Sequence, residues 1–299
     1  MNRAVIAGDA HPELAREIAR QAQVPLLPAS ISAFADGETR VRIEAEVRGT
    51  DLVIVQPTSS PAGERLLTLA LIADAARAAE AARITALVPY FGYARQDVRK
   101  DPGEPRSAQL AARILAVAGI DRVIALELHS SALESAFPMP VTHLRADELL
   151  LPRLRGQRLA IVSPDAGGLK RAQRYAMALG APLAVVAKQR TGADVAVPLQ
   201  VLGEVRGEAC LLVDDMASTG RTIAGAAQAL LAAGAAEVHA LFIHAVMASG
   251  ALERMRAAGV RRILTTDSVR ADAGPGVEVV PTAPLFATVL RPGSLLPQR

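Results

Sequence analysis

The segment with the clearest chemical meaning is a pair of carboxylates followed by hydroxyls and a glycine. The apolar residues 211–213 end at Asp214 and Asp215, and the loop 216–222 leads into an alanine-rich stretch. Ligands of parallel α/β sheets bind beyond the carboxyl ends of strands, and the amides that open the next helix favour an anion. The loop supplies three hydroxyls and a glycine that allows close approach: Ser218, Thr219, Thr222 and Gly220.

Asp214 and Asp215 cannot bind that phosphate themselves, because like charges repel. Their carboxylates suit the hydroxyls of a sugar, or a metal ion, beside the phosphate. The segment therefore indicates a phosphate site without a lysine, and the competing interpretation is a capped helix after a buried strand.

Lys188 is one of three lysines among 33 Lys and Arg residues, and it directly follows an apolar run. A lysine kept in an arginine-rich chain suggests that a compact point charge is wanted there, as against a transferring phosphoryl group. The polar stretch 189–195 contains Gly192 and is typical of a mobile lid. A solvated loop lysine is the alternative.

Two further positions have a chemical and an ordinary interpretation. Arg95 precedes a Gly- and Pro-containing loop that can present a forked phosphate donor, or it is a surface arginine. Glu127 and His129 lie two residues apart at the end of an expected strand, where such positions share a face, so the pair can touch magnesium or its waters. An ordinary hydrogen-bonding histidine is the alternative.

Short apolar runs alternate with alanine-rich stretches, which predicts parallel sheets covered by helices on both faces. Strands are expected at residues 4–7, 52–55, 84–88, 123–128, 159–162, 183–187, 211–213, 238–243 and 263–265. Helices are expected at residues 12–23, 62–81, 107–118, 168–179, 222–233 and 251–258. Ser107 is expected to cap its helix, and glycines end four helices: Gly119, Gly180, Gly234 and Gly259.

Residues 40–45 differ, because apolar and polar side chains alternate with a period of two. The turn residues Asp36, Gly37 and Glu38 precede them, so we expect an exposed flap hairpin.

The same β/α rhythm in both halves predicts two similar α/β domains, each a mainly parallel sheet flanked by helices. We place the first at residues 1–142 and the second at 143–282. Residues 283–299 are expected to return to the first domain, because its sheet would otherwise end early.

Composition narrows the function further. The chain has 299 residues, 51% of them hydrophobic, and no apolar run long enough for a membrane span. Cys210 is the only cysteine, so no internal disulfide can form, and we expect a cytoplasmic protein. The formal charge is +3 and aromatics are 3%, which argues against nucleic-acid binding. The sequence lacks Gly-x-x-x-x-Gly-Lys-Ser/Thr, so it is not a P-loop kinase.

The loop after residue 213 resembles the phosphoribosyl-diphosphate loop shared by ribose-phosphate diphosphokinases and type I phosphoribosyltransferases. Other segments resemble the diphosphokinase pattern in its order, from about residue 3 to residue 290. They are Phe34-Ala-Asp-Gly-Glu38, Pro89-Tyr-Phe-Gly-Tyr-Ala-Arg-Gln-Asp97, Leu126-Glu-Leu-His129, Ser163-Pro-Asp-Ala-Gly-Gly168 and Lys188-Gln-Arg190.

The resemblance implies a role for each matched position. It implies an ATP site in the first domain, with its flap near a subunit interface of a homo-oligomer: Asp36, Gly37, Glu38, Arg95 and Gln96. It implies a ribose 5-phosphate site in the second: Arg190, Asp214, Asp215, Ser218, Thr219, Gly220, Arg221 and Thr222. Lys188 and Arg190 resemble the catalytic pair. His129 and Asp165 resemble magnesium-associated positions, although a helix cap is the alternative for Asp165.

The implied fold is that of type I phosphoribosyltransferases, and the implied reaction serves nucleotide biosynthesis. The β,γ-diphosphate of MgATP is transferred to the 1-hydroxyl of ribose 5-phosphate, giving 5-phosphoribosyl 1-diphosphate and AMP. The alternatives are a phosphoribosyltransferase that consumes the same diphosphate and a catalytically weak regulatory homologue. The chain departs from the family pattern at Glu127, Pro138, Thr142 and Arg221. The loss of acids at Pro138 and Thr142 puts metal details and allosteric control in doubt, whereas Arg221 is still expected to bind phosphate.

Overall fold

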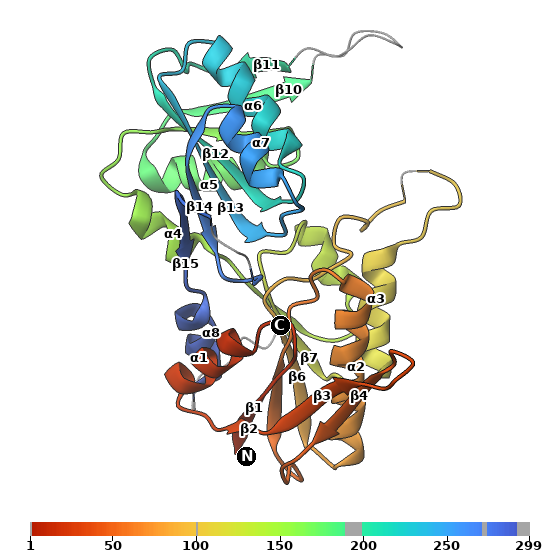
Figure 1. Cartoon of the computed structure of the whole chain (residues 1–299). Helices are drawn as coiled ribbons and strands as arrows, with labels where there is room; N and C mark the ends of the chain where they lie inside the picture. The colour runs from red at the N-terminus through yellow and green to blue at the C-terminus, as the bar shows by residue number, and fades with distance from the viewer. Residues whose placement is uncertain (1, 100, 189–198, 271–273, 292–299) are drawn as a thin grey trace. The chain divides into compact units, whose positions relative to one another are not determined.

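The chain folds into two compact α/β units (Figure 1). The computed structural model describes residues 2–99, 101–188, 199–270 and 274–291. The first unit comprises Met1–Arg145, Ser268–Arg270 and Thr282–Arg299, and the second comprises Ala146–Asp267 and Ala271–Pro281. No pattern in the sequence indicates that the segment Ser268–Arg270 belongs to the first unit. The assignment of one substrate to each unit stays a prediction.

The first unit is built on a six-stranded sheet in which all neighbouring strands are parallel. The strands follow the order β2 (Leu26–Leu27), β1 (Arg3–Ala7), β5 (Asp51–Val55), β6 (Arg83–Val88), β7 (Arg122–Leu126) and β8 (Val141–Leu144). Its helices are α1 (Pro12–Ala22), α2 (Ala62–Ala78), α3 (Ser107–Val117), α8 (Ala283–Leu290) and the 3₁₀ helix η1 (Ser131–Ala136).

The second unit is built on a seven-stranded sheet, parallel except for one edge strand. The order is β11 (Leu199–Leu202), β10 (Leu183–Lys188), β9 (Ala160–Ser163), β12 (Ala209–Ala217), β13 (Glu237–Ala245), β14 (Val260–Thr266) and β15 (Val277–Val280). Its helices are α4 (Asp147–Leu154), α5 (Leu169–Leu179), α6 (Arg221–Ala232) and α7 (Ala251–Ala257). Only β11 runs antiparallel, against β10.

The two sheets share one topology once β11 is set aside. In each, the first parallel strand of the unit lies second in the order, the second lies at one edge, and the remaining four follow in sequence. The expected fold class, two similar parallel-sheet domains flanked by helices, is confirmed.

Burial of apolar strand residues stabilises each of the two sheets. All five residues of β5 are buried, and β6 and β12 are buried over most of their length. Because both faces of each sheet are covered by helices, the strands are apolar runs rather than alternating ones. The side chains of β5 and β6 enter the core of the first unit, and those of β12 and β13 enter the core of the second.

The expected helix ends are confirmed at the glycines. Gly119, Gly180, Gly234 and Gly259 all have positive φ, between 62° and 93°. A residue without a Cβ adopts this conformation at low cost, and it ends the helix. The expectation for Ser107 is wrong: Ser107 is the first residue of α3, and its hydroxyl donates to Gln96 Oε1 instead of capping the helix.

The expected flap is a two-stranded hairpin, β3 (Ala29–Ala33) and β4 (Thr39–Ile43), paired antiparallel. Val41 and Ile43 pack against the core, whereas Arg40 and Arg42 are exposed. The two-residue alternation therefore corresponds to a hairpin strand with one packed face and one exposed face.

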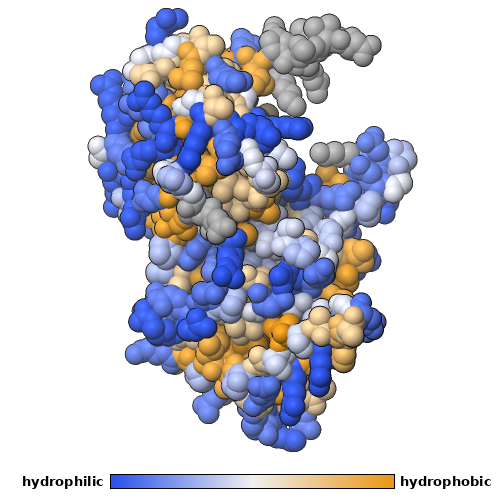
Figure 2. Space-filling model, viewed as in Figure 1, coloured by the Kyte–Doolittle hydropathy of each residue, from blue (hydrophilic) through white to orange (hydrophobic). Residues whose placement is uncertain are grey.

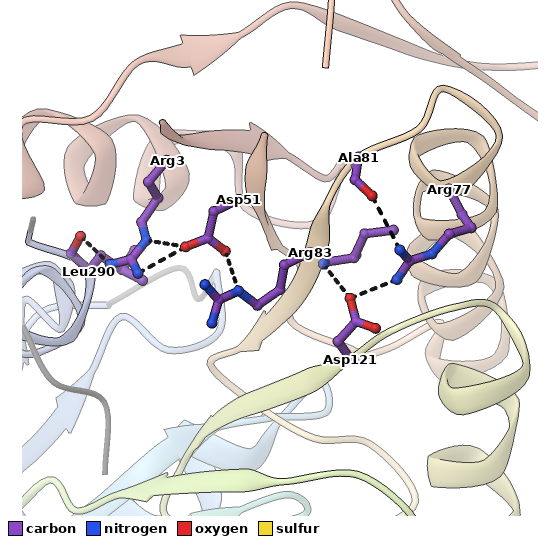
Figure 3. Close-up of polar contacts among 8 residues, drawn as sticks. Arg3, Asp51, Arg77, Ala81, Arg83, Asp121 and Leu290 are labelled. Atoms are coloured by element: carbon purple, nitrogen blue, oxygen red, sulfur yellow. Dashed lines mark hydrogen bonds and ion pairs between the residues drawn. The ribbon is translucent and has the colours of Figure 1, made fainter. Parts of the chain in front are cut away.

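An ionic network joins the first unit at the amino ends of its strands (Figure 3). The Arg3 guanidinium donates to Asp51 Oδ2 at 3.0 Å and to the Leu290 carbonyl at 2.7 Å. Arg83 lies 3.2 Å from the other Asp51 oxygen, and Asp51 is only 4% exposed. Because Leu290 ends α8, the network links the last described helix to β1, β5 and β6. It lies at the amino ends of these strands, whereas the candidate site residues follow the carboxyl ends.

Several short elements escape sequence patterns, including β8, β11, β15 and α4. The helix α4 has Pro152 inside it, which is a strong sequence signal against a helix. Its buried Leu150 and Leu154 compensate by packing.

Candidate functional site

The loop between β12 and α6 is the centre of the candidate site. It turns at Gly220, where φ is 72°, and α6 begins at Arg221. A Cβ on Gly220 would lie 2.8 Å from the Ala251 carbonyl oxygen, so this position excludes larger residues. Ser218 is half-buried, and Thr219 and Thr222 are exposed beside the first-turn amides of α6. The Arg221 amide donates to the Thr219 hydroxyl oxygen at 3.5 Å. Amides and hydroxyls gathered at a helix start are the donors that bind a phosphate.

Asp214 and Asp215 lie side by side before that loop. Asp214 Oδ1 accepts from the Asp215 amide at 2.9 Å, and Asp215 is 3% exposed. Burial and the neighbouring Asp215 raise the pKa of the Asp214 carboxyl well above its usual range, whereas Arg171 lowers it.

The buried Arg171 of α5 is a residue that sequence reasoning missed. Its guanidinium lies 3.7 Å from one oxygen of Asp214 and 3.7 Å from one oxygen of Asp215. Arg171 thus partly balances the carboxylate pair from behind. One signal was present: it is a charged residue on a helix face that otherwise buries Ala172, Tyr175 and Ala176.

A cavity of about 600 Å³ opens at this edge of the second sheet. It joins the loop after β9, the end of β10, the start of β11 and the first turns of α6. It is lined by Pro164, Asp165, Ala166, Gly167, Val186, Ala187, Leu199, Arg221, Thr222 and Gly225. The cavity therefore places the start of the phosphate loop's helix and the end of β10 around one space.

Lys188 is the last residue of β10 and follows Ala187, which lines that cavity. Its backbone pairs with Leu199 of β11. The expected catalytic partner Arg190 and the expected lid at 189–195 lie outside the described residues.

Asp165 is exposed in the loop that leads into α5. Its Oδ1 accepts from the Gly168 amide at 2.9 Å, and its carbonyl accepts from the Ser163 hydroxyl at 2.7 Å. The carboxylate therefore caps the turn before the helix with one oxygen. Among the described residues the second oxygen has no hydrogen-bond partner, so it is available to a ligand.

In the first unit, the loop after β6 carries Arg95 and Gln96. Arg95 is exposed and has no ion-pair partner among the described residues. Gln96 is half-buried, and its Oε1 accepts from the Ser107 hydroxyl. The Asp97 carboxylate accepts from the Ser130 hydroxyl at 2.7 Å, so this loop and the loop after β7 are held together.

His129 lies in the loop after β7 and is exposed, whereas Glu127 is 4% exposed. The expectation that these side chains share a strand face is wrong. The strand ends at Leu126, and Glu127 has a φ of 40°, so the two-residue alternation stops before the pair. Where the described part of the chain is concerned, no three His, Cys, Asp or Glu side chains gather as a metal site. Mg²⁺ commonly binds one or two carboxylates together with substrate phosphates, so a single exposed donor such as Asp165 fits it.

The flap residues Asp36, Gly37 and Glu38 are exposed at the tip of the hairpin. The Asp36 carboxylate accepts from the Glu38 amide at 3.1 Å, and Gly37 has a φ of 92°. Phe34, beside them, is 51% exposed, with the Arg40 guanidinium 5.6 Å from its ring centre. The exposed part of this aromatic ring offers a flat face to a ligand.

Two family models cover most of the chain. Residues 3–119 match the N-terminal domain of ribose phosphate pyrophosphokinase, and residues 131–278 match the phosphoribosyl transferase domain. A ribose-phosphate pyrophosphokinase of Maricaulis maris is 41% identical over 295 residues, which cover 96% of this chain and 95% of that protein. The chain belongs to the ribose-phosphate pyrophosphokinase family.

Further comparisons agree with this family. A ribose-phosphate pyrophosphokinase of Cereibacter sphaeroides is 39% identical and is covered over 90% of its length, by 96% of this chain. The crystal structure of phosphoribosylpyrophosphate synthetase from Mycobacterium smegmatis aligns with a TM-score of 0.91 at 35% identity. That alignment covers 97% of this chain and 98% of the other. The predicted family and enzyme class, a ribose-phosphate diphosphokinase, are thereby confirmed. Among the described residues of this pyrophosphokinase, no helix combines the length and apolarity that a membrane crossing needs.

Proposed function

We propose that this member of the pyrophosphokinase family transfers the β,γ-diphosphate of MgATP to ribose 5-phosphate. The oxygen of the 1-hydroxyl attacks the β-phosphorus, and the bond from that phosphorus to the oxygen shared with the α-phosphate breaks. AMP leaves with that oxygen, the hydroxyl proton is released, and 5-phosphoribosyl 1-diphosphate is formed for nucleotide biosynthesis. The observation that carries the proposal is the cavity shared by the start of α6 and the end of β10.

The second unit supplies the sugar phosphate site in this proposal. The amides and hydroxyls from Ser218 to Thr222 hold the 5-phosphate, and Arg221, which lines the cavity, adds a positive charge. Asp214 and Asp215 orient the ribose hydroxyls. Lys188 and Arg190 neutralise the charge of the transferred group, so the protein contributes position and electrostatics rather than a covalent intermediate.

The first unit supplies the nucleotide site. The exposed Arg95, which has no ion-pair partner within the described ranges, suits a phosphate oxygen of ATP, while Gln96 shapes the loop and the start of α3. The flap residues Asp36, Gly37 and Glu38 meet the adenine, and the exposed ring of Phe34 provides a stacking face for it.

Magnesium is the cofactor that we assign to the reaction. Bound together with ATP, it would neutralise charge on the transferred group. We propose one candidate metal donor in each unit: the second carboxylate oxygen of Asp165 in the second unit, and the exposed His129 in the first.

A homo-oligomer with the ATP site near a subunit interface also remains a proposal. The outer face of α3 supports it, because Leu110, Ile114 and Val117 are 49%, 36% and 90% exposed. Figure 2 shows apolar side chains on the side of the molecule where α3 lies in Figure 1. Such a stripe on a helix is typical of a protein contact surface. We place the enzyme in the cytoplasm, acting on small molecules without nucleic-acid or membrane partners.

One assay tests the function. Purified protein is incubated with Mg²⁺, ATP and ribose 5-phosphate, and AMP and 5-phosphoribosyl 1-diphosphate are quantified. We expect equal amounts of both products, and omission of either substrate is the control. Consumption of added 5-phosphoribosyl 1-diphosphate with a nucleobase, without its synthesis, would favour a phosphoribosyltransferase; no turnover of either kind would favour a regulatory homologue.

A further inference from the structure

The turn that carries His129 departs sharply from the strand before it. The strand β7 ends at Leu126, and Glu127 adopts a φ of 40°, in the left-handed region that favours glycine. A buried, non-glycine residue persists there only when its surroundings hold it. The question is therefore which contacts hold this turn.

His143 supplies one of them. It lies on β8, opposite Ala125 of β7 in the sheet register. The Glu127 amide donates to the Leu144 carbonyl at 2.8 Å, which is an ordinary sheet bond. The next amide, of Leu128, turns away from the ladder and donates to His143 Nε2 at 2.9 Å. The His143 side chain thus accepts a hydrogen bond from the segment after β7, beyond the last backbone bond between the two strands.

The partners of the imidazole determine its tautomer. A backbone amide only donates, so His143 Nε2 is the acceptor and carries no proton. The other nitrogen, Nδ1, lies 2.7 Å from Glu134 Oε1 in η1. Its N–H donates to that carboxylate, which fixes both the tautomer and the ring orientation.

A second contact holds the turn on its other side, where Ser130 donates to Asp97 at 2.7 Å. His129 lies between the amide held by His143 and the hydroxyl held by Asp97. With both neighbours fixed, the exposed His129 side chain starts from a fixed backbone.

We propose that His143, oriented by Glu134, is a positioning residue that fixes the Glu127–Leu128–His129 turn and thereby sets His129 for the MgATP-dependent reaction. This inference rests on the role of His129 under the proposed function. Groups that act one contact away from a site commonly change affinity or activity by about 10–100-fold when they are removed.

Three variants test it. His143→Leu removes the acceptor for the Leu128 amide, and His143→Gln can return an acceptor close to the position of Nε2. His239→Leu is the matched control, because His239 also lies beside a glutamate, at 3.7 Å from Glu237, but near the amino end of β13 in the second unit.

The first measurements need no catalysis. Nitrogen NMR of the wild-type protein should show His143 as the Nδ1–H tautomer. Amide hydrogen exchange should show Leu128 protected in the wild type and in His143→Gln, and exchanging at least about tenfold faster in His143→Leu. An Nε2–H tautomer, or an unprotected Leu128 amide in the wild type, overturns the proposal.

Kinetics and titration provide the second set. We expect His143→Leu to lower kcat/KM for MgATP by about 10–100-fold with little change in the KM for ribose 5-phosphate, and His143→Gln to recover most of the loss. His239→Leu should behave as the wild type. Equal losses for both substrates, or full activity in His143→Leu, would mean a merely structural histidine and would refute the inference.

Failure of the proposed function is distinguishable from failure of this inference. If the wild type makes no 5-phosphoribosyl 1-diphosphate, the proposed function fails. Calorimetric titration of MgATP then decides the role of His143: weaker binding in His143→Leu with recovery in His143→Gln supports it, and equal binding in all variants overturns it.

Discussion

The two sheets share a topology, but their side chains differ at the carboxyl end of the third parallel strand. The third parallel strand of the first unit, β5, and that of the second, β12, each run into a polar loop and then a helix. In the first unit this edge is closed by its own side chains, whereas in the second it borders the 600 Å³ cavity.

The closure in the first unit is visible in Gln56, which follows β5 and is fully buried. Its Oε1 accepts from the Ala10 amide at 3.1 Å, and its Nε2 donates to Asp9 at 2.8 Å. A Cβ on Gly8 would lie 2.1 Å from that Oε1, so the backbone is packed directly on the amide. Thr58 continues the closure, because its hydroxyl oxygen accepts from the Gly92 amide at 2.7 Å.

The second unit leaves the equivalent groups open. Thr219 and Thr222 are exposed at the start of α6. Where the first unit has the neutral amide of Gln56, the second has Asp214 beside the buried, like-charged Asp215. The shared topology thus provides helix-start amides at both edges, and the side chains decide whether those amides are closed in the protein or offered to a ligand.

The largest effect should come from the charge at the open edge. We expect Lys188→Ala to lower kcat by about 10²–10³-fold or more without unfolding the protein, because a preorganised charge at the transferred group is lost. The measurement is AMP release from MgATP and ribose 5-phosphate, with circular dichroism to check folding. Lys170→Ala removes an exposed lysine of α5 and serves as the control. Undiminished AMP release in Lys188→Ala would remove this residue from the mechanism.

Two intermediate effects should distinguish the open edge of the second unit from the closed edge of the first, one on a KM value and the other on stability. Thr219→Ala combined with Thr222→Ala should raise the KM for ribose 5-phosphate by about tenfold or more, since two donors are lost, while the KM for ATP changes little. Thr58→Val at the closed edge should instead lower stability by about 1–3 kcal/mol, because it leaves the buried Gly92 amide unpaired. Substrate titrations and thermal unfolding measure the two results. A similar rise in both KM values for the double variant would contradict the contrast.

The smallest expected effect is on the free energy of unfolding, and it comes from the ionisation of Asp214 in the second unit. Burial and Asp215 raise the pKa of Asp214 in the folded state above its unfolded value, so ionisation of Asp214 disfavours folding. Stability is therefore lost as the pH rises from the unfolded pKa through the folded pKa. Asp214→Asn should be more stable than the wild type by about 1 kcal/mol at neutral pH, the usual size of such active-site gains, although less active.

Unfolding midpoints at several pH values check this prediction. The difference between Asp214→Asn and the wild type should shrink below the unfolded pKa, near pH 4, where the wild-type carboxyl is protonated in both states. Gln56→Ala at the closed edge is the contrast: it should lower stability at every pH, because it leaves the partly buried Ala10 amide without this acceptor. A stability difference for Asp214→Asn that does not depend on pH would contradict the assignment.

Local sequence patterns predicted what depends on nearest neighbours. Short windows of the chain predicted the glycines that end helices, the alternation at Val41 and Ile43 and the turn at Gly220 before α6. They failed where a strand ended early, since Glu127 stops the alternation on which the Glu127 and His129 pair was based. They also missed α4, whose Pro152 opposes a helix that packing nevertheless supports.

The sequence by itself determined the family and the two α/β domains, and it located the loop that we propose as the phosphate site, because periodicity, turn residues and ordered motifs are local. Only the tertiary structure decided which residues contact the proposed site residues. Arg171 reaches Asp214, and His143 reaches Leu128, across distances in the chain that no local pattern spans. The order of strands in each sheet brings them together, and that order follows from the burial of both sheet faces rather than from any single segment.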